Sequence, residues 1–235
     1  MTLFQNPFAK LGRRAWGLYI CSLCVVTVSA LFGDGIDLLS LATSLVGVTA
    51  LILLAVGDVW GQILSCLFAL LYATVSLRLH YYGEAITYLC MSAPASFCSV
   101  ISWMRHPAER GKNVVKIRPL RPVELFGISL AALGITAGGY FVLAAWSTPQ
   151  LPVATFSLLT SFFASALMFF RSPYYAIAYT ANDAVLIVLW GTACFADLRY
   201  LSVVACFVAF LANDLFAFVE WRKRQKKQNG SENVL

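Results

Sequence analysis

The chain has 235 residues, of which 60% are hydrophobic and only 12% are charged, and its mean hydropathy is +0.77. A soluble domain carries roughly 25% charged residues and has no way to bury such an excess of apolar side chains. This composition excludes a secreted disulfide scaffold, a disordered chain and an ordinary cytosolic enzyme. The net charge of +6 therefore reflects membrane topology and not binding to nucleic acid.

Apolar segments long enough to cross a bilayer recur along the whole chain. A membrane-spanning helix needs about 20 residues, and Gly, Pro and Asp residues mark short breaks between the segments. We predict an all-α polytopic membrane protein with eight transmembrane helices. The expected spans are residues 15–33, 37–56, 59–79, 83–104, 123–146, 153–170, 173–194 and 198–221.

The basic residues predict the topology of these spans. Fifteen of the 17 Lys and Arg residues lie in the N-terminal segment, in the loop 105–121, at Arg171 or in the tail after residue 221. Eight spans place all four regions on one side of the membrane. Because cytoplasmic loops are enriched in Lys and Arg, we expect a multi-pass plasma-membrane protein with both termini in the cytoplasm.

Two triplets of spans resemble each other at an offset of about 118 residues. Trp103 ends the first triplet and Trp221 ends the second, and basic residues follow both. An odd number of spans separates the triplets, so they form a parallel repeat of the kind found in some transporters. The predicted organisation is an N-terminal segment with an extra helix (1–35), a first three-helix bundle (36–104), a basic loop with a linker helix (105–150), a second three-helix bundle (151–221) and a basic cytoplasmic tail (222–235).

Polar residues inside the second triplet indicate a substrate path. Asn182 and Asp183 lie in the seventh span, and Asn213 and Asp214 lie in the eighth. A carboxylate at the centre of a bilayer costs a few kcal/mol, so such residues face a polar cavity or each other. Tyr175 and Tyr179 lie seven and three residues before Asn182, so all three share one face of the predicted helix. The two tyrosines are therefore further candidates for the site.

The first triplet offers a weaker polar set for the opposite wall of the path. Its candidates are Gln62, Ser65, Tyr88 and Ser92. Glu84 lies one turn inside its span, where it either faces the path or sits at the membrane interface. The tyrosine rings are suited to stacking on a flat heterocycle, and amides offer both donors and acceptors to a sugar or a base.

The remaining chemistry-bearing residues predict neither an enzyme nor a cofactor. The cysteines lie in or beside apolar runs, where Cys packs as a small hydrophobe. The sequence contains no zinc-type cluster, phosphate-binding loop or nucleophile elbow. We therefore expect no cofactor and no metal. Two other classes stay open: an intramembrane enzyme in which Asp183 and Asp214 share a proton, and a membrane scaffold.

Several stretches between residues 36 and 224 resemble the PnuC family of nicotinamide riboside transporters, relatives of the SWEET sugar transporters. The chain is most similar to the subgroup found in many Gram-positive bacteria. The resemblance implies facilitated diffusion of a nucleoside by alternating access, trapping by a cytoplasmic kinase, and a possible homotrimer in the lipid bilayer. The stretches that carry it are GDVWGQ (57–62), HYYGEAITY (80–88), Ser102-Trp103, RSPYYAIAYTAND (171–183) and Asn213-Asp214 before Trp221.

The resemblance has one departure that concerns the substrate. Nicotinamide riboside carriers of this family have a Trp-x-x-Trp motif in the span that here contains Tyr175 and Tyr179. Relatives in the wider family carry thiamine or deoxyribonucleosides. We therefore expect nicotinamide riboside as the substrate, while deoxyribonucleosides or thiamine, with or without proton coupling, stay open as alternatives. Asp183 and Asp214 would suit a cationic ligand, ribose hydroxyls or a proton.

Overall fold

The structure is a computed structural model that describes residues 6–31, 37–109, 112–196 and 198–232. Within these ranges the regular elements are helices, accompanied by two isolated β-bridges. The break expected between the first two spans, at residues 34–36, lies outside the described residues. The elements are η1 (Pro7–Lys10), α1 (Arg13–Ser29), α2 (Leu38–Ala55), α3 (Val59–Arg78), α4 (Tyr82–Ile86), η2 (Thr87–Ser92), α5 (Ala93–Arg105), α6 (Pro122–Ala145), α7 (Leu151–Phe169), α8 (Tyr175–Ala196), η3 (Leu198–Tyr200) and α9 (Leu201–Glu232).

Seven spans among the described residues are long and apolar enough to cross a membrane. They are α2, α3, the continuous stretch from α4 to α5, α6, α7, α8 and α9. Helix α1 has 17 residues and is shorter than each of these spans. The prediction of an all-α, multi-pass membrane protein is confirmed, whereas the count of eight transmembrane helices stays a prediction.

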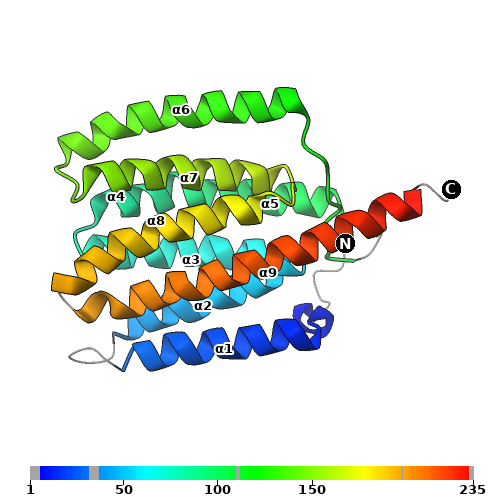
Figure 1. Ribbon diagram of the computed structural model, residues 1–235, viewed down its shortest axis with the longest axis horizontal. Helices are drawn as coiled ribbons and strands as arrows, with labels where there is room; N and C mark the ends of the chain where they lie inside the picture. Colours follow the sequence, from blue (N-terminus) through cyan, green and yellow to red (C-terminus); the bar gives the residue numbers. More distant parts are fainter. Residues whose placement is uncertain (1–5, 32–36, 110–111, 197, 233–235) are drawn as a thin grey trace.

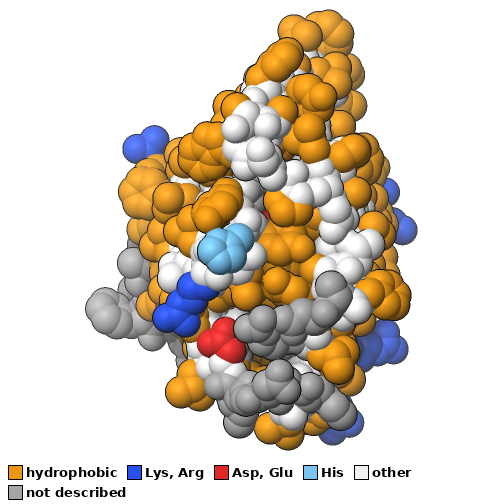
Figure 2. Space-filling view, turned by 90° about the vertical axis from the view of Figure 1, so that its left-hand side faces the viewer, with side chains coloured by type: hydrophobic (Ala, Val, Ile, Leu, Met, Phe, Trp, Pro, Cys, Tyr) orange, Lys and Arg blue, Asp and Glu red, His pale blue; other side chains and the backbone are white. Residues whose placement is uncertain are grey.

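The helices lie side by side along the long axis of the molecule (Figure 1). Helices α2, α3, α8 and α9 form the middle, α6 packs on α7 at one edge, and α1 packs on α2 and α9 at the other. One end, called the loop end here, holds η1, the segment between α5 and α6, and the end of α9 (Figure 1). Figure 2 shows the opposite end, where hydrophobic and neutral side chains predominate.

Four helices end in the same way, in a residue with positive φ followed by a 6→1 backbone hydrogen bond, which is the Schellman motif. At the end of α2 this residue is Gly57, where an added Cβ would overlap the guanidinium of Arg224. Glycine lets the guanidinium of α9 lie directly against the backbone of this turn and adopts the positive φ without strain. The positive-φ residues are Gly57, His80, Ser147 and Arg171.

Two fully buried tryptophans close the loop end of the bundle. The rings of Trp103 and Trp221 are 5.5 Å apart between centroids. Trp103 Nε1 donates to the carbonyl of Met168 at 3.3 Å, and Trp221 Nε1 donates to the carbonyl of Leu54 at 2.9 Å. Each acceptor lies next to the last residue of its helix, α7 or α2. Each tryptophan thus ties the last helix of one predicted triplet to the first helix of the other.

The span that contains Pro94 is locally widened. Proline lacks a backbone N–H and disrupts regular α-helical bonding, and a π-helical turn, η2, directly precedes this residue. The amide of Ala93 donates to the carbonyl of Tyr88 in this turn. Because π-turns frequently occur at functional sites, the two residues of η2 that the sequence predicted for the site, Tyr88 and Ser92, are strengthened as candidates.

Candidate functional site

A small cavity lies in the middle of the bundle, between the two predicted triplets. Its volume is about 70 Å³, and α2, α3, η2, α5, α7, α8 and α9 all contribute to its walls. Eight of the ten side chains predicted for the site line it. Those eight residues are Gln62, Ser65, Tyr88, Ser92, Tyr179, Asn182, Asp183 and Asp214.

Asn182 is held by two hydroxyl groups of the neighbouring helix α7. Its Oδ1 accepts hydrogen bonds from Thr160 Oγ1 and Ser161 Oγ, each at 2.8 Å. The side chain is 2% exposed, and no hydrogen bond of its Nδ2 is formed within the described part of the chain. The amide therefore has a satisfied oxygen on one side and a donor nitrogen still available on the other.

A stripe of three buried serines on α7, here called the serine stripe, supports residues on other helices. Ser157, Ser161 and Ser165 follow each other at intervals of four residues and thus share one face. Ser165 Oγ lies 3.0 Å from the hydroxyl of Tyr179. Ser157 Oγ donates to Glu84 Oε1 at 3.2 Å. Our sequence reasoning missed this stripe, although its i, i+4, i+8 spacing in an apolar span was a detectable signal.

Two buried carboxyl groups face the cavity from α8 and α9. Asp183 is 3% exposed and Asp214 is 2% exposed, and their side chains are close enough to interact. Asp183 Oδ2 has no hydrogen-bond partner among the described residues. Burying an unpaired carboxylate is costly, so this pair marks a position where a ligand, a cation or a proton is expected.

Gln62 supplies a second amide from the opposite wall, on α3. Its side chain is 1% exposed, and its Nε2 has no partner among the described atoms. Ser65, one turn further along α3, donates to the carbonyl of Gly61 at 2.9 Å, which leaves its oxygen able to accept a hydrogen bond. The cavity therefore contains unused donors on two different helices.

Aromatic side chains complete the cavity. Phe68 and Phe210 have ring centroids 5.2 Å apart, and the ring of Tyr88 meets Phe68 edge-on at 5.9 Å. Gly47 on α2 allows this approach, since an added Cβ would overlap Cζ of Phe210 and lie 2.8 Å from two atoms of the Phe68 ring. The flat surfaces offered to a ligand thus come mainly from α3, η2 and α9.

Two predicted site residues lie outside the cavity wall. Tyr175 is fully buried in the aromatic cluster of the loop end, where its ring contacts Trp221 at 4.7 Å and its hydroxyl donates to the carbonyl of Leu54 at 3.4 Å. Asn213 points toward α1, and its Nδ2 donates to Ser22 Oγ at 2.9 Å. Sequence spacing gives the helical face correctly for Tyr179 and Asn182, but it does not show which neighbour occupies the other positions.

Glu84 is buried inside the helix bundle. It is 2% exposed, and its Oε2 has no partner in the described chain. Its other oxygen accepts the hydrogen bond from the serine stripe. Glu84 does not line the central cavity, but Tyr88, one turn further along the same span, does.

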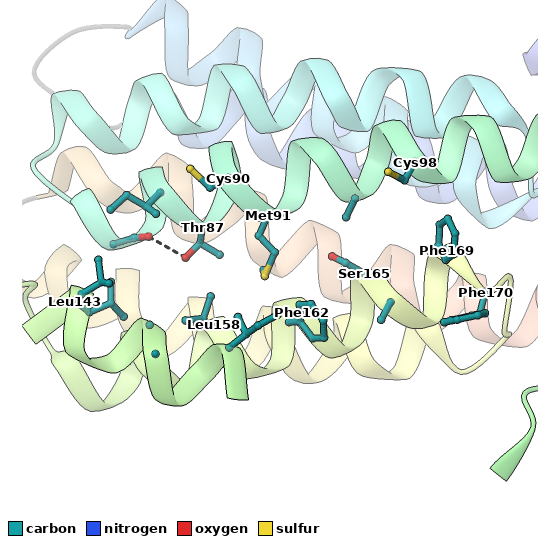
Figure 3. A pocket seen from close by; sticks show the side chains of 18 residues that line it. Thr87, Cys90, Met91, Cys98, Leu143, Leu158, Phe162, Ser165, Phe169 and Phe170 are labelled. Atoms are coloured by element: carbon teal, nitrogen blue, oxygen red, sulfur yellow. Dashed lines mark hydrogen bonds between the residues drawn. The ribbon is translucent and has the colours of Figure 1, made fainter. Parts of the chain in front are cut away.

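A larger groove of about 660 Å³ lies between the α4–α5 span, α6 and α7 (Figure 3). Its walls are almost entirely apolar, with Met91, Leu158 and Phe162 pointing into it (Figure 3). The hydroxyl of Thr87 is already bonded to the carbonyl of Gly83 at 2.9 Å, as the dashed line shows. This groove lacks the free polar groups that a nucleoside requires, so the small central cavity is the better candidate site.

The described residues contain no group of three His, Cys, Asp or Glu side chains that is suited to hold a metal ion. All seven cysteines are free thiols, and Cys21 and Cys24 are exposed on α1. The polar chemistry of the central cavity therefore consists of amides, hydroxyls and carboxyl groups, which bind by hydrogen bonds and charge.

Comparison with known proteins identifies the family. The family model for the nicotinamide mononucleotide transporters matches residues 37–223. The nicotinamide riboside transporter PnuC of Neisseria mucosa is 22% identical over 197 residues, which cover 82% of this chain and 74% of that protein. The crystal structure of the vitamin B3 transporter PnuC has the same fold, with a TM-score of 0.80 at 19% identity over 93% of this chain and 94% of that one. The chain therefore belongs to the nicotinamide mononucleotide transporter family, the family of PnuC, and is a membrane transporter, as its sequence predicted.

Proposed function

We propose that this protein carries nicotinamide riboside across the plasma membrane by facilitated diffusion, and that cytoplasmic phosphorylation then traps the nucleoside. One observation carries this proposal: a buried cavity between the two helix triplets holds unpaired amide and carboxyl groups in the middle of apolar spans. The names of the relative from Neisseria mucosa and of the related crystal structure support the choice of substrate.

The chemistry of nicotinamide riboside matches the cavity. Its pyridinium ring is positively charged, and we propose that Asp183 and Asp214 balance this charge. The donors of Asn182 and Gln62 would bind oxygen atoms of the carboxamide or the ribose. The aromatic rings near Tyr88 would pack against the heterocycle. In this proposal Ser65, Ser92 and Tyr179 complete the wall, while Tyr175 and Asn213 lie outside it and stabilise the packing of α8 and α9 in the bundle.

We further infer that transport proceeds by alternating access between the two triplets, 36–104 and 151–221. Nucleoside-sized ligands occupy pockets of about 300 Å³ or more, so a cavity of about 70 Å³ must widen when substrate enters. The reciprocal bonds of Trp103 and Trp221 and the matching turns at Gly57 and Arg171 support a parallel repeat. Rocking of two such repeats would open each side in turn.

We infer the same membrane topology from the positions of the charges. The loop end holds η1, the basic segment before α6 and the basic end of α9, which supports a cytoplasmic loop end by the positive-inside rule. Both termini would then be cytoplasmic, and α1 would be an eighth, short transmembrane helix. The homotrimer stays a prediction from the family resemblance alone.

The test is uptake into liposomes that contain only the purified protein. Nicotinamide riboside, thiamine and deoxyribonucleosides are offered separately, with and without a pH gradient. We expect selective entry of nicotinamide riboside that stops at equal concentrations inside and outside and is independent of the gradient. Recovery of chemically unchanged ligand excludes the intramembrane enzyme. Selective uptake of thiamine or a deoxyribonucleoside would refute the proposed substrate while retaining the transporter.

A further inference from the structure

We propose that Thr160 and Ser161 are positioning residues that orient the amide of Asn182, so that it meets the ligand as a hydrogen-bond donor. The site would then select ligands that place an acceptor oxygen against Asn182 Nδ2. The identity of that ligand rests on the proposed function, but the orientation of the amide does not.

The hydroxyl of Ser161 determines the direction of the amide. It forms no other hydrogen bond within the described residues, so its proton has a single acceptor, Asn182 Oδ1 at 2.8 Å. Thr160 lies at the same distance from Oδ1 but is also within 3.1 Å of the carbonyl of Phe156 and 3.0 Å of that of Ser157. The single proton of Thr160 is thus shared among three acceptors, whereas that of Ser161 goes to Oδ1 alone, and this bond turns Nδ2 away from α7.

The nitrogen of Asn182 is therefore left for the cavity. Asn182 lines this cavity and is 2% exposed, so its unused donor is available to a ligand in the cavity. Gln62 Nε2, on the opposite wall, is buried and has no partner among the described atoms. A buried donor without a partner is costly, and a ligand oxygen removes that cost. A site of this kind discriminates strongly against an analogue that lacks the acceptor.

The two hydroxyls also prevent the alternative orientation. Without them, the side-chain amide of Asn182 is free to rotate by half a turn and exchange its oxygen and nitrogen. Its oxygen would then face the cavity, which already contains the acceptors of Asp183 and Asp214. Loss of the hydroxyls should consequently weaken ligand binding more than it weakens folding.

The experiment compares ligand affinity in purified variants, by calorimetry with nicotinamide riboside. Thr160→Val with Ser161→Ala removes both hydroxyls at nearly constant shape and should weaken binding at least tenfold. Thr160→Ser keeps its hydroxyl and should stay within about twofold of the unaltered protein. Thr155→Val is the matched control, because this threonine on α7 bonds only the carbonyl of Leu151.

Asn182→Asp tests the direction of the amide. The aspartate retains an oxygen toward α7 but replaces the donor by a second oxygen, so we expect a loss of affinity of at least tenfold. Binding as tight as that of the unaltered protein would show that Asn182 acts as an acceptor and would overturn the proposal. Unchanged affinity in the variant lacking both hydroxyls would overturn it as well.

A ligand-free measurement separates this proposal from the proposed function. Ser161→Ala, Asn182→Ala and the double variant form a double-mutant cycle, in which the midpoint of thermal unfolding is measured for each protein. A double variant less destabilised than the sum of the single changes supports the hydrogen bond, and simple additivity refutes it. If the protein binds no nicotinamide riboside but shows this coupling, the substrate assignment fails and the positioning role stands.

Discussion

Gly47→Ala should damage the substrate site without preventing folding. The new Cβ would overlap Cζ of Phe210 and lie 2.8 Å from two atoms of the Phe68 ring, whereas carbon atoms pack best at about 3.5–4.0 Å. Both rings must therefore retreat by roughly 1 Å or more, and the adjacent space that yields most easily is the central cavity, which holds about 70 Å³ and is lined by both rings. Overpacking of this kind costs about 1–3 kcal/mol of folding stability. A ligand that has to push the displaced rings back out of the cavity meets a penalty of the same order, which corresponds to a roughly 5- to 150-fold loss of affinity.

The assay for this variant is ligand binding combined with thermal unfolding in detergent. We expect weakened binding and slowed uptake, with a cooperative unfolding transition that shifts by only a few degrees. Gly134→Ala on α6 is the matched control, because an added Cβ meets nothing within 4 Å there. Normal affinity of Gly47→Ala would refute the assignment of this cavity as the substrate site.

Three further changes test separate parts of the site. Asp183→Asn should weaken binding of nicotinamide riboside at least tenfold but leave an uncharged deoxyribonucleoside within about threefold, because it removes negative charge facing a cationic ring. Trp221→Phe removes the hydrogen bond to Leu54, worth about 1 kcal/mol, and should speed labelling of a cysteine introduced at position 54 by a water-soluble thiol reagent. Asn213→Ala should lower the unfolding midpoint by several degrees and leave ligand affinity unchanged, because its amide bonds Ser22 of α1.

The first two of these changes have a control on the same molecule, and the third has an outcome that would contradict it. Glu220→Gln removes an acidic charge that is paired with Lys223, outside the cavity, and should leave the binding of both ligands unchanged. Trp146→Phe alters a tryptophan that is 54% exposed and should not affect labelling. If Asn213→Ala abolished binding in a stably folded protein, the structural role of this amide would be wrong and its direct contact with substrate would be restored.

The order and position of the helices were largely predictable from the sequence. Each expected span from 37–56 onward coincides with a helical span of the structure. The first expected span, 15–33, is met by a helix that ends at Ser29. The spans are predictable because a helix that crosses the bilayer needs about 20 consecutive apolar residues, and such a run is visible in the sequence.

The composition of the site was also predictable, but the direction of each side chain was not. Asn182 and Asn213 occur in similar tetrads, yet the first lines the cavity and the second bonds α1. Helical periodicity shows that two residues share a face, but it does not show which neighbour covers that face. That depends on the rotation of each helix in the bundle.

Tertiary contacts also determined what each polar group is able to do. Ser161 looks like an unremarkable small residue in an apolar span, but its contact with Asn182 leaves the amide nitrogen as the available donor. Glu84 is similar: its distance from the end of its span left open whether it faces the path or the membrane interface, and only packing against α7 shows that it is buried. The hydropathy of a helix depends only on its own residues, so it can be calculated from the sequence. Hydrogen-bond partners come from a different helix, so they exist only once the bundle has packed.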